Sequence, residues 1–137
     1  MHPPFHLAIP VTDLERTRRF YVDMLGAVEA RSAPRWVDFN FFGHQLSAHL
    51  VDHIPREKTN PVDGHAVPAR HFGVVLEWGV WQKMVDQLQA HSVQFLIEPG
   101  VRFEGKVGEQ STCFFEDPSG NVLEFKSFRD PEQLFAH

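Results

Sequence analysis

The chain has 137 residues, 42% of them hydrophobic, and a net charge of -5 with neutral histidines. This length suits one ordinary domain with a buried core, and a single cysteine cannot form an internal disulfide. The acidic balance argues against nucleic-acid binding, no apolar run is long enough to cross a bilayer, and the first residues lack a signal peptide, so we expect a cytoplasmic protein.

The first half of the chain predicts a strand, a helix and three more strands. The opening strand covers residues 5–11. Thr12 and Glu15 form a capping box for a helix that runs to about Leu25 and ends at Gly26. Period-two patterns and turn residues then predict three strands, at residues 28–31, 36–42 and 45–51.

The second half predicts the same order of elements. Its helix covers residues 80–90, and its strands cover residues 71–77, 93–97, 111–116 and 122–128. An order repeated in this way indicates an internal duplication of a βαβββ unit, with unit one at about 5–51 and unit two at about 70–128. The predicted fold class is therefore α+β, with two paired βαβββ units.

The segment between the units, residues 52–69, contains three prolines and a glycine without periodicity. This composition predicts a linker or loop. Its length leaves two interpretations open, a lid or interface segment and an ordinary surface loop. The polar tail at 129–137 is expected to fray.

Strand alternation brings three potential metal ligands to one sheet face. Neighbouring side chains on a strand point to opposite faces, and the apolar sets must pack under the helices. The opposite face then receives His6 from the first strand, His71 from the strand at 71–77 and Glu124 from the last strand.

Two imidazoles and one carboxylate form the facial triad that binds Fe(II), and the same set suits Mn, Ni, Co or Zn. A single strand histidine is usually structural, so the prediction rests on the three residues together. Glu124 stands in the apolar run at 122–125, where an unpaired carboxylate would be costly. An ion pair with Arg102 is the alternative to a metal.

These residues resemble the vicinal oxygen chelate superfamily, which includes glyoxalase I, extradiol dioxygenases, fosfomycin resistance enzymes and bleomycin-binding proteins. The matching motifs begin at His6, at His71 and at Phe115, the last reading Phe-Glu-Asp-Pro-Ser-Gly-Asn-Val-Leu-Glu-Phe to position 125. The resemblance spans residues 5 to 128. It implies a single domain over 1–137, folded as a cup-shaped mixed sheet with helices on its outer face and metal ligands inside the cup.

One position departs from the glyoxalase pattern. Glyoxalase I takes a fourth ligand from the last strand of the first unit, where this chain has Ser47, a poor ligand. His49 lies two residues further on the same face, and three roles stay open for it: a fourth ligand, a catalytic acid or base, and a lining residue. Trp36, Asp38 and Asn40 share a strand face that would line the cup.

The leading functional hypothesis is an enzyme that uses a divalent metal on a small oxygen-rich substrate, with Fe(II) favoured and extradiol-dioxygenase-like chemistry preferred. A glyoxalase-like lyase or isomerase is the second hypothesis. A metal-free binding protein of the bleomycin-resistance kind is the third. A fosfomycin-type transferase would need a cationic pocket, for which Arg102 and Lys106 are the candidates, although charged residues of a loop are usually solvated.

The resemblance also implies a homodimer, since superfamily members with two units commonly pair. Each metal site could lie within one chain or be shared between two. The other predicted partner is a small-molecule substrate. Its candidate contacts are Ser47, Trp36, Asn40 and Arg102.

Overall fold

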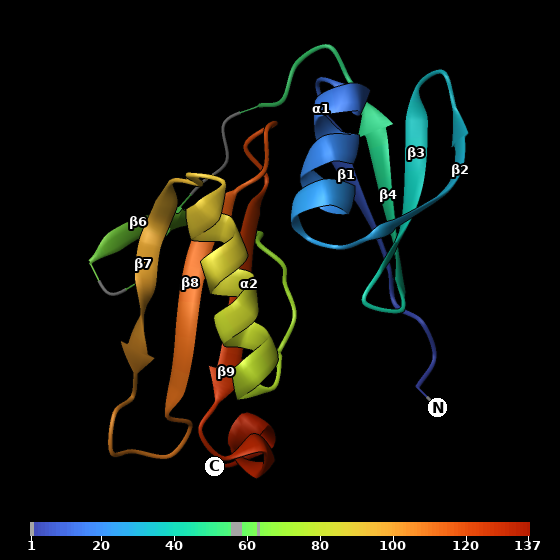
Figure 1. The fold of residues 1–137 in the computed structure, drawn as a ribbon. Coiled ribbons are helices and arrows are strands. Elements are labelled where there is room, and N and C mark those ends of the chain that lie inside the picture. Colours follow the sequence, from blue (N-terminus) through green and yellow to red (C-terminus); the bar gives the residue numbers. More distant parts are fainter. Residues whose placement is uncertain (1, 56–58, 63) are drawn as a thin grey trace. The chain divides into compact units, whose positions relative to one another are not determined.

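In the computed structural model, residues 2–55, 59–62 and 64–137 are described. They form two compact units, shown in Figure 1. Unit 1 comprises Met1–Arg56 and Asp117–Asn121, and unit 2 comprises Glu57–Glu116 and Val122–His137. Both contain helix and sheet, so the predicted α+β class is confirmed. Unit 1 has the predicted order of strand, helix and three strands, and in unit 2 a helix is again followed by three strands.

Unit 1 is a four-stranded sheet covered by one helical segment. The sheet order is β1-β4-β3-β2, with β1 parallel to β4 and the other pairs antiparallel. Its elements are β1 (His6–Val11), α1 (Leu14–Arg18), the π-helix η1 (Arg19–Met24), β2 (Val28–Ala33), β3 (Trp36–Phe41) and β4 (His44–Leu50).

The helix of unit 1 begins differently from the prediction. Its N-cap is Asp13, whose carboxylate accepts from the Arg16 N–H at 2.9 Å, so Thr12 is not the cap. A carboxylate accepts this bond better than a hydroxyl and also suits the positive end of the helix dipole. Buried Tyr21 then lies against Phe39 of the sheet, with the two ring centres 5.6 Å apart.

A two-residue turn joins β3 to β4. Phe42 and Gly43 both have positive φ, 53° and 85°, as a type I′ hairpin requires. The Asn40 side chain accepts from the Gly43 N–H at 2.8 Å and stabilises the turn. The turn sets the register of β3 and β4, which places Asp38 opposite Ser47.

Unit 2 repeats this plan with a three-stranded antiparallel sheet, in the order β7-β8-β9. Helix α2 packs on the sheet, and its Trp81 indole donates to the Phe125 carbonyl at 2.9 Å. The helix begins two residues before the predicted start at Val80. The elements are α2 (Trp78–Ala90), β7 (Phe95–Arg102), β8 (Gln110–Glu116) and β9 (Val122–Phe128).

The predicted strand at 71–77 is not a regular strand. It makes two isolated parallel bridges to β9, Phe72 with Leu123 and Val75 with Lys126. Gly73 explains how closely the two segments approach, because a Cβ at this position would lie 1.6 Å from the Glu124 carbonyl oxygen. The segment therefore still runs along β9, as a βαβββ unit requires.

The linker and the tail are more structured than predicted. The linker contains a hairpin of β5 (Thr59–Val62) and β6 (His65–Pro68), and its Val67 is buried in a cluster with Phe114 of unit 2. The tail forms the 3₁₀-helix η2 (Pro131–Phe135), capped by Asp130. Packing in the hairpin and capping in the tail outweigh the weak local pattern that predicted loops. None of the helices in the described parts is long and apolar enough to cross a membrane.

The turn between β8 and β9 belongs to unit 1. In it, Asp117 accepts from the backbone N–H groups of Ser119 and Asn121, both at 2.9 Å. The Tyr21 hydroxyl donates to the same carboxylate at 2.8 Å, and the Asn121 amide donates to the Pro10 carbonyl at 2.8 Å. The motif 117–121 thus anchors its turn to helix η1 and strand β1.

Candidate metal site

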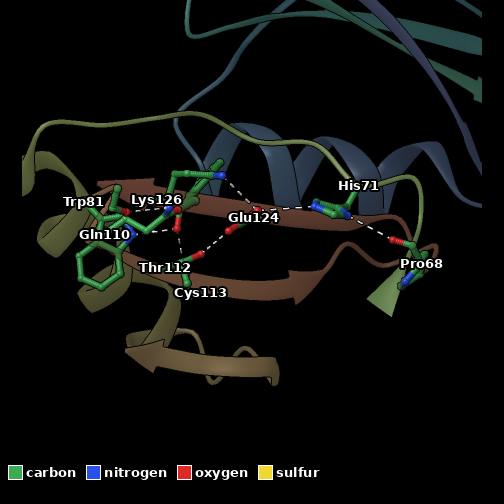
Figure 2. A network of polar contacts seen from close by, with 10 residues as sticks. Pro68, His71, Trp81, Gln110, Thr112, Cys113, Glu124 and Lys126 are labelled. Atoms are coloured by element: carbon green, nitrogen blue, oxygen red, sulfur yellow. Dashed lines mark hydrogen bonds and ion pairs between the residues drawn. The ribbon is translucent and has the colours of Figure 1, made fainter. Parts of the chain in front are cut away.

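Two of the three predicted ligands lie side by side in unit 2. The Nε2 atom of His71 is 3.5 Å from Oε1 of Glu124, as Figure 2 shows. Glu124 comes from the middle of β9, and His71 directly precedes the segment that bridges to β9. The parallel bridge at Phe72 therefore sets the two side chains against each other.

The Glu124 carboxylate is buried and held from two directions. Only 6% of the residue is exposed. Its Oε2 accepts from the Thr112 hydroxyl at 2.5 Å, and its Oε1 lies 3.6 Å from the Lys126 ammonium (Figure 2). Thr112 lies opposite Lys126 on the neighbouring strand β8. A buried charge needs such partners, and this arrangement leaves Oε1 facing both His71 and the cation.

The surroundings of the His71 ring favour one tautomer. Its Nδ1 is 3.2 Å from the Pro68 carbonyl oxygen at the end of β6. A carbonyl can only accept, so a hydrogen bond here places a proton on Nδ1, and in the neutral ring Nε2 is then the atom with the lone pair. The ring also meets Phe114 edge to face, with centroids 5.2 Å apart, and Phe114 packs against Val67 of the linker hairpin. The hairpin therefore helps to orient the histidine.

The third predicted ligand, His6, lies in unit 1 at the start of β1. Its Nδ1 is 2.9 Å from the side-chain oxygen of Gln45, its cross-strand neighbour on β4. Gln45 in turn donates to Asp38 at 3.2 Å. His6 is exposed, whereas Asp38 is only 7% exposed.

The two ligand candidates of unit 2 fit a divalent transition metal. Two ligands that each bind one ion at about 2.0–2.2 Å cannot be more than about 4.4 Å apart, and the 3.5 Å between His71 and Glu124 satisfies this limit. Metal-bound histidines usually donate their second ring N–H to an oxygen, and Nδ1 of both His71 and His6 lies within hydrogen-bond distance of such an oxygen. Among the described residues no three His, Cys, Asp or Glu side chains cluster closely enough to hold a metal. The shared three-ligand site therefore stays a prediction.

The predicted residues of β4 have different surroundings. Ser47 is 4% exposed, and its hydroxyl donates to the Asp38 carboxylate at 2.7 Å. His49 is exposed and lies opposite half-buried Trp36 on β3. Their cross-strand pairing puts His49 and Trp36 on the face that carries Ser47. The predicted contact Asn40 is engaged in the β3–β4 turn.

Arg102 is the last residue of β7, so the prediction that placed it in a loop is wrong. The strand continues past residue 97 because β7 pairs with β8 as far as Arg102 and Gln110. The Arg102 guanidinium lies 5.0 Å from the centre of the Phe103 ring. Lys106, the other cation considered for a phosphonate, lies in the exposed β7–β8 loop.

Sequence reasoning missed three side chains that organise these ligands. Lys126 could have been found, since it is two residues after Glu124 on the same strand and so shares its face. Thr112 and Gln45 depend on the register between strands, which no local pattern reveals. They lie opposite Lys126 and His6, respectively.

Cys113 is fully buried, and burial raises the pKa of its thiol to about 12. The thiolate required of a nucleophile is therefore not formed near neutral pH.

Comparison with known proteins agrees with this fold. A family model for the glyoxalase/bleomycin resistance protein/dioxygenase superfamily matches residues 4–125. A glyoxalase/bleomycin resistance protein/dioxygenase from Alicyclobacillus acidocaldarius has 35% identity and a TM-score of 0.85, with 98% of this chain and 97% of that chain covered. A search of curated proteins by sequence found no match.

More distant structures share the fold. The fosfomycin resistance protein FosX from Listeria monocytogenes has 18% identity and a TM-score of 0.73, covering 97% of this chain and 98% of that one. A FosX variant in complex with Mn(II) and 1S,2S-dihydroxypropylphosphonic acid has 16% identity and a TM-score of 0.75, covering 100% and 99%. The protein is a member of the glyoxalase/bleomycin resistance protein/dioxygenase superfamily.

Proposed function

We propose that the protein is an enzyme that uses a divalent metal, bound by His6, His71 and Glu124, to act on a small oxygen-rich substrate. The observation that carries the proposal is the state of the donor atoms. Both histidines have Nδ1 engaged with an oxygen, and Glu124 has one carboxylate oxygen engaged with Thr112. Nε2 of each histidine, and Oε1 of Glu124 beside Lys126, are thus the donor atoms proposed for a metal.

The metal would supply oxygen activation if it is Fe(II), or Lewis-acid polarisation of substrate oxygens if it is redox-inert. The chain's own residues would orient the substrate and move protons. Lys126 lies beside Glu124, where its ammonium would attract an anionic group. His49, exposed on the predicted ligand face of β4, is the candidate acid or base.

Within this class we favour extradiol-dioxygenase-like Fe(II) chemistry, which the ligand set of two histidines and one glutamate supports. A second candidate is a redox-neutral reaction on an anionic substrate such as a phosphonate. Lys126 favours it, and the FosX complex with Mn(II) and a phosphonic acid is a precedent in the same fold.

Metal binding is the first test. Isothermal titration of metal-stripped protein with Mn(II) should show a site that Glu124→Gln weakens by at least about 100-fold, because the substitution removes a charged ligand. Glu116→Gln is the matched control, since Glu116 is an exposed carboxylate at the end of β8. Equal affinity of wild type and Glu124→Gln would refute the site.

Turnover separates the candidate reactions. Protein loaded with Fe(II), Mn(II) or Zn(II) would be assayed with catechols for oxygen consumption, with a glutathione hemithioacetal for isomerisation and with an epoxide phosphonate for ring opening. Oxygen consumption with Fe(II) alone would support the dioxygenase. Oxygen consumption that is as fast with Zn(II) as with Fe(II) would exclude the dioxygenase mechanism, because zinc has no redox chemistry. Tight binding of bleomycin by metal-free protein would instead indicate a binding protein.

A further inference from the structure

A chain of hydrogen bonds leads from the interior of unit 1 to His6. It begins at the buried hydroxyl of Ser47, which donates to Oδ1 of Asp38 at 2.7 Å. The other carboxylate oxygen of Asp38 accepts from the Gln45 amide at 3.2 Å, and the Gln45 oxygen lies 2.9 Å from Nδ1 of His6. All four residues come from adjacent strands of one sheet, in the order β3, β4 and β1.

The direction of this chain follows from what each group can donate. An ionised carboxylate only accepts, so Asp38 forces the NH₂ group of Gln45 toward itself. The amide oxygen of Gln45 must then face His6. Because that oxygen also only accepts, Nδ1 of His6 must carry a proton, and in the neutral ring Nε2 then keeps its lone pair.

We propose that Asp38 and Gln45 are positioning residues that hold neutral His6 in its Nδ1–H tautomer and so present Nε2 as the binding atom. This inference rests on the proposed metal-binding function for its purpose. The tautomer itself is a property of the metal-free chain. In this role Asp38 would not be a metal ligand, because it contacts Gln45 and its effect would pass through the Gln45 amide to His6.

The geometry makes Asp38 the residue that decides the direction. Asp38 is 7% exposed and Ser47 4% exposed, so water competes little for the carboxylate. Gln45 is exposed, and without Asp38 its amide could rotate and offer NH₂ to the ring. A donor at that position would stabilise the Nε2–H tautomer, in which the binding atom is blocked by a proton.

The test is the tautomer of His6 in metal-free protein. Long-range ¹H–¹⁵N correlation spectra at a pH of about 8.5, where an ordinary histidine is neutral, distinguish the two tautomers directly. The His6 signals are assigned by their loss in His6→Ala. We expect Nδ1–H in the wild type, and a shift toward Nε2–H in Asp38→Asn, whose amide can donate to Gln45 and allow it to rotate.

Two further variants keep the test decisive. Ser47→Ala removes the other bond to Asp38 but leaves a carboxylate there, so the Nδ1–H tautomer should persist. Gln45→Met removes the acceptor for His6 at an exposed position, where misfolding is not expected. His6 should then no longer be held as Nδ1–H, and this can be observed even if Asp38→Asn does not fold. A purely structural role for Asp38 would predict the same tautomer in every folded variant.

Metal titration gives the second readout. Asp38→Asn and Gln45→Met should lower the affinity for Mn(II) by about 10- to 100-fold, as the loss of a group that orients a metal ligand typically does, whereas Ser47→Ala should lower it much less. A wild-type His6 in the Nε2–H form, or a Gln45→Met variant that keeps pure Nδ1–H, would overturn the inference. Wild-type protein with the Nδ1–H tautomer and no affinity for any divalent metal would refute the proposed function but leave the tautomer assignment standing.

Discussion

At the scale of single residues, Gly73 has the clearest steric requirement. A Cβ at this position would lie 1.6 Å from the carbonyl oxygen of Glu124 and 2.6 Å from its carbonyl carbon. Both are backbone atoms of β9, so no side-chain rotation relieves the clash. The close approach of this segment to β9 also sets His71 against Glu124. Gly73 therefore supports the candidate site through the backbone.

We predict that Gly73→Ala lowers the free energy of unfolding by at least about 2–3 kcal/mol, because a methyl group has no space without backbone movement. The same movement would separate His71 from Glu124 and weaken Mn(II) binding. Urea unfolding monitored by circular dichroism measures the first effect, and isothermal titration the second.

The control is Gly79→Ala in the first turn of α2. A methyl group at Gly79 would have no neighbouring atom within 4 Å, and the φ of this residue is not positive. Alanine there should leave stability unchanged or raise it by up to about 1 kcal/mol. If the Gly73→Ala protein were as stable as the Gly79→Ala protein, the prediction would be contradicted, because the β9 backbone could then move aside at little cost in free energy.

At the scale of elements, the turn at 117–121 and helix η1 are joined through a buried phenol and a buried carboxylate. Burial, together with the Asp117 charge, raises the pKa of Tyr21 well above its usual value of 10.0. Burial also raises the pKa of Asp117, an effect that hydrogen bonds from Asn121 and Tyr21 oppose. The pair is therefore stable with Tyr21 neutral.

The raised pKa of Tyr21 predicts that the folded state loses stability at alkaline pH. The folded state keeps the Tyr21 proton above pH 10, whereas the unfolded chain releases it, so stability should fall as the pH rises from about 10 toward the folded pKa. Tyr21→Phe should remove this part of the pH dependence. At neutral pH it should cost about 1–3 kcal/mol for the lost buried hydrogen bond.

Tyr21 is the chain's one tyrosine, so tyrosinate absorbance reports on it alone. Urea unfolding from pH 8 to pH 11 would be compared in wild type, Tyr21→Phe and Ser119→Ala. Ser119→Ala removes the bond from the Thr12 N–H to the same turn but leaves Tyr21 and Asp117 intact. It should keep the alkaline decline. A native tyrosine that ionises at its ordinary pKa would contradict the prediction.

At the scale of the whole molecule, the predicted ligands divide between the units, with His6 in unit 1 and His71 and Glu124 in unit 2. This division allows a site within one chain or one shared by two chains of a homodimer. Strands β1 and β7 are edge strands of their sheets, and the unpaired backbone groups of an edge strand favour pairing with another chain. We predict a homodimer with shared sites.

Light scattering at micromolar concentration tests the dimer, and a monomer of 15.8 kDa with a full complement of metal would disprove it. Mixing His6→Ala with Glu124→Ala tests sharing. If His6 of one chain meets Glu124 of its partner, each mixed dimer has one intact site and about half the activity of the wild-type dimer. If each site lies within one chain, every site in the mixture is damaged and no activity returns.

The sequence alone was sufficient to predict the α+β class, the order of elements in unit 1, and the helix and last three strands of unit 2. The resemblance of its motifs predicted the superfamily. These follow from local patterns, such as the alternation in β9 and the turn motif at 117–121, because a strand or turn depends mainly on its own residues. Alternation also indicated that His71 and Glu124 share a face. The local pattern was too weak to predict the β5–β6 hairpin and the 3₁₀-helix η2, which were expected to be loop and tail.

Only the tertiary structure decided which residues support the ligands. Thr112 and Gln45 are far in sequence from Glu124 and His6, and only the register of neighbouring strands brings each pair together. The irregular bridge at residues 72–75 likewise depends on the backbone of β9 approaching Gly73. Local propensity specifies most of the helices and strands of this protein. Pairing between distant segments decides which donor atom of each candidate ligand is available, because a hydrogen-bond partner must lie close in space and not in sequence.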